Sequence, residues 1–166
     1  MSTVTVTYVY THTVAFVTQK ILYSLKEIIR EVGLSPAKMT QSWITLERGV
    51  SAWLLSRHLK QACLEVFDPR DHSLVIRWDF EFLYGYAGDG SMWADTGSIR
   101  YHIAKAGLAP AGCDYRITLW VAAGAPDVVG WENCTPFSTA GLRRYAVGTT
   151  VGAEGLSAST YYWRKP

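Results

Sequence analysis

Near the N-terminus, apolar residues recur every three or four positions, which is the spacing of one face of an α-helix. The residues of this stripe are Val14, Val17, Ile21, Leu25, Ile28 and Val32. Gly33 directly behind the stripe is suited to end the helix. Ser35 and Pro36 are typical of a helix start, and the same spacing predicts a second helix over residues 36–58. Gly49 lies inside it and costs a helix about 1 kcal/mol relative to alanine.

Beyond residue 60, apolar and polar residues alternate, which is the period of a β-strand. This pattern predicts strands over residues 62–67, 74–84 and 115–121, with a turn at 68–71 and a third helix over 96–106. In the longest strand, Arg77, Asp79 and Glu81 share one face while apolar residues occupy the other. One face of the sheet is therefore expected to pack on the helices, and the other to be solvated or covered by polar contacts.

The segment from Ala122 onward is rich in glycine and proline and is too long for an ordinary loop. Trp131 and the aromatic run Tyr161-Tyr162-Trp163 are expected to anchor it on the body of the domain. One interpretation is a movable segment with apolar contacts. The alternative is a fixed β-hairpin with strands over 142–147 and 159–163.

Composition narrows the class of protein. The chain has 166 residues, 49% hydrophobic and 18% charged, which is typical of one globular domain. No run reaches the ~18 apolar residues of a membrane span, and no secretory signal is visible, so we expect a cytoplasmic protein without membrane contact. A net charge of +2, scattered along the chain, predicts no direct nucleic-acid binding.

Cysteine and histidine give no sign of a metal or redox centre. Cys63, Cys113 and Cys134 include no Cys-x-x-Cys pair, and the four histidines share no ligand spacing. We expect reduced, mostly buried thiols, with no metal and no cofactor.

The best candidates for catalysis are Asp79 and Glu81, which lie on one strand face about 7 Å apart. Such a pair suits a general acid and base, but Arg77 on the same face favours an ion-paired stripe. Two alternatives remain open. One is a small α+β hydrolase or isomerase that uses Asp79 and Glu81, and the other is a ligand-binding module whose aromatic residues line a pocket.

Several stretches carry a resemblance to a known family. They read Thr-Tyr-Val-Tyr-Thr-His-Thr-Val at 7–14, Leu-Val-Ile-Arg-Trp-Asp-Phe at 74–80, Tyr-Gly-Tyr at 84–86, Gly-Asp-Gly-Ser-Met-Trp at 88–93, Pro-Asp-Val-Val-Gly-Trp at 126–131 and Tyr-Trp-Arg at 162–164. In this order and spacing they resemble bacterial HORMA-domain proteins of anti-phage second-messenger (CBASS) operons. The resemblance spans nearly the whole chain, although none of these stretches is a catalytic signature.

The resemblance implies an α+β fold in which three helices pack on a central antiparallel sheet. A single domain would cover residues 1–166, with an N-terminal segment at 1–10, a core at about 11–123 and a C-terminal safety belt at about 124–166. The implied protein is no enzyme. It is an adaptor that closes its belt over a closure peptide, then binds and activates a nucleotidyltransferase of the CD-NTase type that makes cyclic oligonucleotides. An AAA+ remodelling ATPase would open it again.

The resemblance also implies site residues. The closure peptide would add as a strand beside Tyr115, Arg116, Ile117, Thr118, Leu119, Trp120 and Val121. The safety belt would use Trp131, Leu142, Tyr145, Val147 and Trp163 as contacts. The ATPase would engage Ser2, Thr3, Val4, Thr5 and Val6, and the Thr/Val alternation of residues 2–10 predicts an edge strand there.

Overall fold

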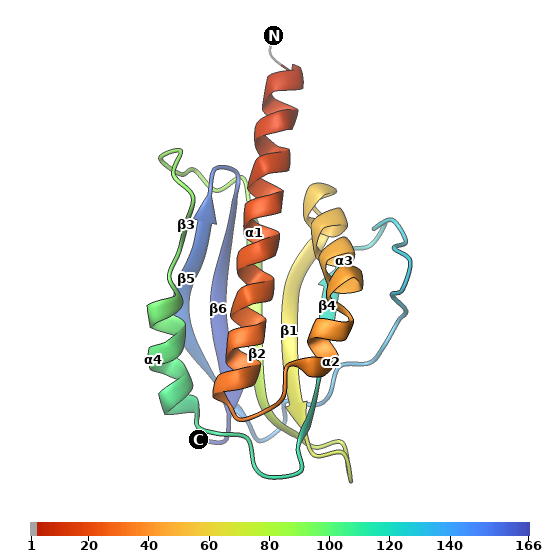
Figure 1. The fold of residues 1–166 in the computed structure, drawn as a ribbon, viewed down its shortest axis with the longest axis vertical. Coiled ribbons are helices and arrows are strands. Elements are labelled where there is room, and N and C mark those ends of the chain that lie inside the picture. Colours follow the sequence, from red (N-terminus) through yellow and green to blue (C-terminus); the bar gives the residue numbers. More distant parts are fainter. Residues whose placement is uncertain (1–2) are drawn as a thin grey trace.

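A computed structural model describes residues 3–166 of the chain. These residues form α1 (Thr3–Glu31), α2 (Ala37–Gln41), α3 (Trp43–Leu55), β1 (Leu59–Phe67), β2 (Leu74–Tyr84), β3 (Trp93–Ala94), α4 (Thr96–Ala106), β4 (Asp114–Val121), β5 (Arg143–Ala153) and β6 (Leu156–Arg164). The strands make one antiparallel sheet in the order β3-β5-β6-β2-β1-β4. The helices cover one face of it, with α1 in the middle between α3 and α4 (Figure 1).

The core lies between α1 and the sheet. The stripe predicted from the sequence faces inward, and Val17, Ile21, Leu25 and Ile28 are all completely buried. The inward face of β2 contributes Trp78 and Phe80, which are also completely buried. Burial of this much apolar surface is the main force that holds the helix layer on the sheet.

The predicted helices are confirmed, with two differences. Residues 36–58 form two helices rather than one, because Ser42 leaves the helical conformation with φ −100° and ψ 12°. The edge strand expected at residues 2–10 is wrong for the described part of that segment, since α1 already begins at Thr3. Once the stripe at 14–32 has nucleated a helix, each added residue gains a hydrogen bond, which outweighs the small helix penalty of Thr and Val. Ser2 lies outside the described residues.

The C-terminal segment contains the β-hairpin that the sequence left open as the alternative to a movable segment. Residues 142–147 and 159–163 fall almost entirely in β5 and β6, which pair with each other, and β6 also pairs with β2. Sequence reasoning missed β3, a strand of two residues that pairs with β5. Gly152 of β5 makes room for it, since a Cβ there would lie 2.5 Å from the Trp93 indole. A polypeptide stretch at 122–142 connects β4 to this hairpin, and we call it the crossing loop.

Substitution Leu25→Ala should lower the free energy of unfolding by about 2–5 kcal/mol, because it leaves a cavity in a completely buried position. Ile44→Ala is the matched control on α3, where the side chain is 70% exposed, and should change stability by no more than about 0.5 kcal/mol. Urea denaturation measures both. Equal losses in the two variants would contradict the assigned inward face of α1.

Candidate functional site

The strand β4 lies at an edge of the sheet and pairs only with β1 among the described strands. It contains all seven residues at 115–121 for which the family resemblance implied peptide binding. The backbone N–H and C=O groups on the free side of an edge strand have no strand partner, so such an edge is a template for another extended chain.

The two faces of β4 differ in chemistry. Ile117 and Leu119 pair with Leu64 and Ala62 and face the helices, where both remain only partly buried. Residues 116, 118 and 120 face the opposite side, and the Trp120 indole N–H donates to the Thr118 hydroxyl at 3.3 Å. On the helix-facing side of β4, the hydrophobic core therefore ends in apolar side chains that are only partly covered.

The crossing loop leaves a cavity of about 680 Å³ between itself and β4. Residues 116–121 of β4, most of loop residues 122–136 and Trp53 of α3 line this cavity. The loop runs beside the free edge as an irregular stretch of chain, which is separate from β4 in Figure 1. The edge is thus enclosed by the loop without being filled by it.

On the helix side, the loop is held by what we call the tryptophan anchor. The Trp131 indole N–H donates to the Thr45 carbonyl at 3.0 Å, and the Trp53 indole N–H donates to the Pro126 carbonyl at 2.7 Å. The two rings meet edge to face with centroids 5.7 Å apart. Gly49 makes this possible, because a Cβ there would lie 2.4 Å from the Trp131 indole nitrogen. Gly49, although unfavourable within α3, thus leaves the space that the Trp131 indole occupies.

On the opposite face, the loop is held by what we call the carboxylate anchor. Glu65 of β1 is completely buried, and its two oxygens accept from the Arg116 guanidinium at 2.6 Å and from the Phe137 backbone N–H at 2.8 Å. Arg116 also donates to the Thr135 carbonyl at 2.6 Å and lies 3.8 Å from the centre of the Phe137 ring. Since the two anchors lie on opposite faces of the sheet, the loop passes around the free edge of β4.

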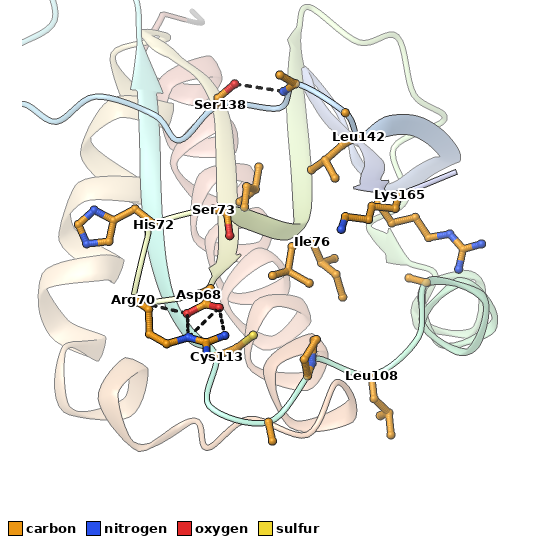
Figure 2. A pocket seen from close by; sticks show the side chains of 18 residues that line it. Asp68, Arg70, His72, Ser73, Ile76, Leu108, Cys113, Ser138, Leu142 and Lys165 are labelled. Atoms are coloured by element: carbon orange, nitrogen blue, oxygen red, sulfur yellow. Dashed lines mark hydrogen bonds and ion pairs between the residues drawn. The ribbon is translucent and has the colours of Figure 1, made fainter.

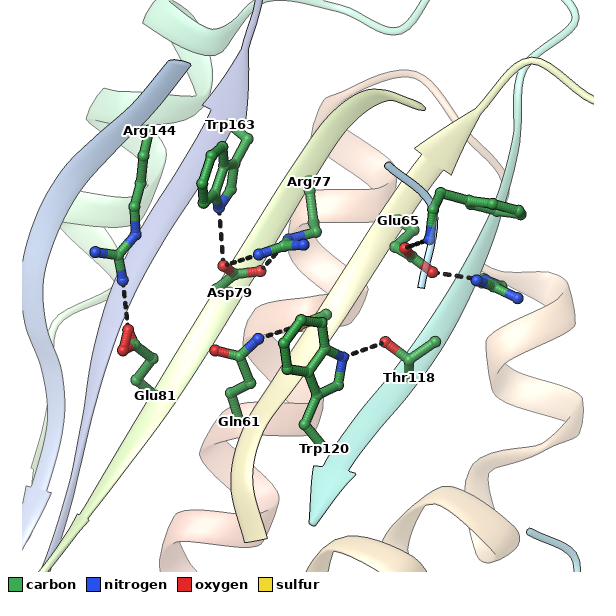
Figure 3. Close-up of polar contacts among 12 residues, drawn as sticks. Gln61, Glu65, Arg77, Asp79, Glu81, Thr118, Trp120, Arg144 and Trp163 are labelled. Atoms are coloured by element: carbon green, nitrogen blue, oxygen red, sulfur yellow. Dashed lines mark hydrogen bonds and ion pairs between the residues drawn. The ribbon is translucent and has the colours of Figure 1, made fainter. Parts of the chain in front are cut away.

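The strand face with Asp79 and Glu81 is an ion-paired stripe, as Figure 3 shows. Asp79 accepts from Arg77 at 2.8 and 2.9 Å and from the Trp163 indole at 2.9 Å. Glu81 is bonded to Arg144 of β5. Neither carboxylate lines the cavity beside β4, and both have partners that occupy their oxygens. This arrangement gives no support to the hydrolase or isomerase alternative.

The remaining belt residues expected at the site lie elsewhere. Tyr145 stacks on Tyr162 with ring centroids 5.1 Å apart, Val147 is on β5, and the Trp163 indole donates to Asp79. Leu142 lines a different cavity. β5 and β6 are separated from β4 by β2 and β1, so of the five expected belt contacts only Trp131 lies beside the edge strand.

Residues Thr3–Val6, expected to meet an ATPase, lie in the first turns of α1. The structure adds Thr45, Gly49, Trp53 and Glu65 to the site. Two features of the sequence pointed to them: Gly49, which is unfavourable inside a helix, and Glu65, a charged residue in the otherwise largely apolar strand 62–67.

A second cavity, of about 730 Å³, lies beside the turn between β1 and β2 (Figure 2). Leu142, Ile76 and Leu108 line it together with the turn at Asp68 and Arg70. Bonds from the Arg70 side chain and backbone lower the pKa of Asp68 to about 2. These two charges satisfy each other, so the cavity offers no unpaired cluster of functional groups there.

In the described part of the chain, no three side chains of His, Cys, Asp or Glu come together as the ligands of a metal ion would. Cys63 is buried, Cys113 is partly buried, and Cys134 is exposed, which corrects the expectation of mostly buried thiols. Burial and the charge of Asp79 raise the pKa of the Cys63 thiol. Among the described residues no helix is long and apolar enough to cross a membrane.

The family comparison decides the identity of this fold. The family model for bacterial HORMA domain 2 matches residues 1–166. The chain is a bacterial HORMA domain. No curated protein matches it.

Solved structures extend the likeness of this HORMA domain at the level of the fold. A chain of the mitotic checkpoint complex has a TM-score of 0.74 and 10% identity, covering 93% of this chain and 99% of that one. HTP-2 of C. elegans bound to the HIM-3 closure motif has a TM-score of 0.69 and 16% identity, covering 92% and 90%. The CdnC:HORMA-deltaN complex of E. coli MS115-1 gives a TM-score of 0.56 and 12% identity, covering 96% and 89%.

Substitution Glu65→Gln should destabilise the domain by about 2–3 kcal/mol, because it leaves Arg116 without its buried carboxylate and turns an amide N–H₂ toward one of two donors. Amide exchange at Phe137 should accelerate. Glu81→Gln is the matched control, since the side chains of Glu81 and Arg144 are 37% and 41% exposed, and should cost less than about 1 kcal/mol. Urea denaturation and amide exchange measure both variants. Unchanged exchange at Phe137 in Glu65→Gln would refute the carboxylate anchor.

Substitution Gly49→Ala should displace Trp131, because the new methyl group would overlap the indole. The usual helix gain of about 1 kcal/mol from Gly→Ala should therefore be lost, and amides at 126–131 should exchange faster. Gly97→Ala in α4 is the control, since its methyl would meet only the Asp95 carboxylate at 3.5 Å, and it should stabilise or leave stability unchanged. A Gly49→Ala variant that is more stable than the parent, with slow loop amides, would contradict the tryptophan anchor.

Proposed function

We propose that this HORMA domain is a peptide-binding switch that accepts a closure peptide as an extra strand beside β4. The observation that carries the proposal is the free edge of β4 held beneath a loop that is fastened on both faces of the sheet. HTP-2, which shares this fold, was solved with a closure motif bound. Strand addition would satisfy the free backbone groups of the edge and supply affinity, while side-chain pockets supply specificity.

Peptide entry requires the crossing loop to move, since the loop surrounds the edge on which the peptide would lie. The contacts that fasten the loop include two indole hydrogen bonds, the bonds to the buried Glu65 carboxylate and to Arg116, and the packing of the Phe137 ring. A neutral hydrogen bond contributes about 1 kcal/mol net, so release of one anchor costs only a few kcal/mol. A difference of this size lets a ligand or a remodelling enzyme shift the population of the two arrangements.

The partners we propose follow from the family. The closed domain would bind and activate a CD-NTase-type nucleotidyltransferase in a CBASS defence system in the cytoplasm, in keeping with the CdnC:HORMA-deltaN complex of E. coli. An AAA+ ATPase would reopen it by engaging residues 2–6. The N-terminal end of α1 projects beyond the sheet, which makes it an accessible handle (Figure 1). In this proposal the domain acts as an adaptor and performs no catalysis.

Selection of random 12-residue peptides displayed on phage, with the full chain as bait, should yield binders. In a synthetic copy of a selected peptide, N-methylation removes one backbone N–H at a time. Because only every second residue of an added strand directs its N–H toward β4, the loss of affinity should alternate along the peptide. Fluorescence anisotropy measures the affinities. The proposal is refuted if no peptide is selected, or if methylation at neighbouring positions has the same effect throughout.

A further inference from the structure

A peptide strand beside β4 would direct every second side chain toward the helices. Residues that lie next to each other on neighbouring strands point to the same face of a sheet. Peptide residues next to Ile117 and Leu119 would therefore point into the helix-facing half of the cavity. There they would meet Trp53 of α3 and Trp131 of the crossing loop, which line the same cavity.

This half of the cavity offers apolar surface. Ile117 and Leu119 pack against the core without being fully covered. The two indole N–H groups are already used, one on the Pro126 carbonyl and one on the Thr45 carbonyl, so the rings present carbon surface. A polar side chain placed here would lose its hydrogen bonds to water without gaining a hydrogen-bond partner. A large apolar side chain would instead bury its own surface and that of Ile117 and Leu119.

One wall of this half belongs to the crossing loop, which must move if a peptide is to enter. Trp131 reaches its place only because Gly49 has no Cβ, and Gly130 approaches Thr45 so closely that a Cβ there would lie 2.8 Å from the Thr45 methyl group. If the loop leaves α3, the wall leaves with it. The pocket for a peptide side chain therefore exists only while the loop is fastened.

We propose that the peptide carries a large apolar side chain facing the helices, which Trp53, Ile117, Leu119 and Trp131 receive, and that Gly49 is the positioning residue for this pocket. The proposal rests on the proposed function and adds to it. In this arrangement the selection of a peptide is coupled to the closure of the loop, because the apolar side chain of the peptide packs on Trp131, which fastens the loop. A peptide without that side chain would leave the loop easier to release.

The test is a double-mutant cycle with a peptide selected from the phage library. Its helix-facing apolar residue is replaced by alanine, and the affinity of both peptides is measured for the parent chain, Gly49→Ala and Gly97→Ala. In the parent and in Gly97→Ala, the replacement should weaken binding about 30-fold or more, as expected for removal of a large buried side chain. In Gly49→Ala, which circular dichroism must show to be folded, the same replacement should weaken binding less than about 3-fold, because the pocket has lost its wall.

The outcomes separate the two proposals. Selected peptides that bind but carry polar residues at the helix-facing positions would overturn the pocket while leaving strand addition intact. Equal losses in the parent and Gly49→Ala would overturn the role of Gly49 and Trp131. Failure to select any peptide would overturn the proposed function, and the pocket with it.

Discussion

The site depends on one constraint: the crossing loop must pass around the free edge of β4 while it is fastened to both faces of the sheet. An unprotected edge strand invites pairing with any extended chain. Here the loop encloses the edge at a distance, fastened to α3 through Trp131 and to β1 through Glu65. The enclosed space of about 680 Å³ is what distinguishes this edge from the opposite one, where the short strand β3 pairs directly with β5.

The rest of the C-terminal segment is built differently from the loop. β5 and β6 pair along most of their lengths, β6 pairs with β2 through eight residue pairs, and Tyr162 is buried between Trp78 and Tyr145. The loop is held by fewer contacts: its two anchors, the Ala122 N–H bond to the His58 carbonyl, and the packing of the Phe137 ring on Phe67. Local opening follows the distribution of buried contacts, so the loop should open at a much lower free energy than the hairpin. In the proposed switch, the loop therefore moves more easily than the hairpin.

The sequence predicted the regular elements well where one period dominates: the residue ranges of β2 and α4 match those of the structure, and the 14–32 stripe is the buried face of α1. It failed at residues 3–10, where Thr/Val alternation favours a strand but continuation of a helix decides the conformation. The tryptophan and carboxylate anchors could not be predicted from the sequence. The contact of Gly49 with Trp131, and that of Glu65 with Phe137, join residues more than seventy positions apart, which no local pattern specifies.

The most direct test of the account is residue-resolved amide exchange along β4 in the free chain, measured by NMR. Amides at 115–121 should alternate between slow exchange, where the N–H bonds to β1, and fast exchange, where it faces the enclosed space. Addition of a peptide selected from the phage library should slow the fast set alone. Uniformly slow exchange along β4 in the free chain would mean that the loop itself lies on the edge and would contradict the account.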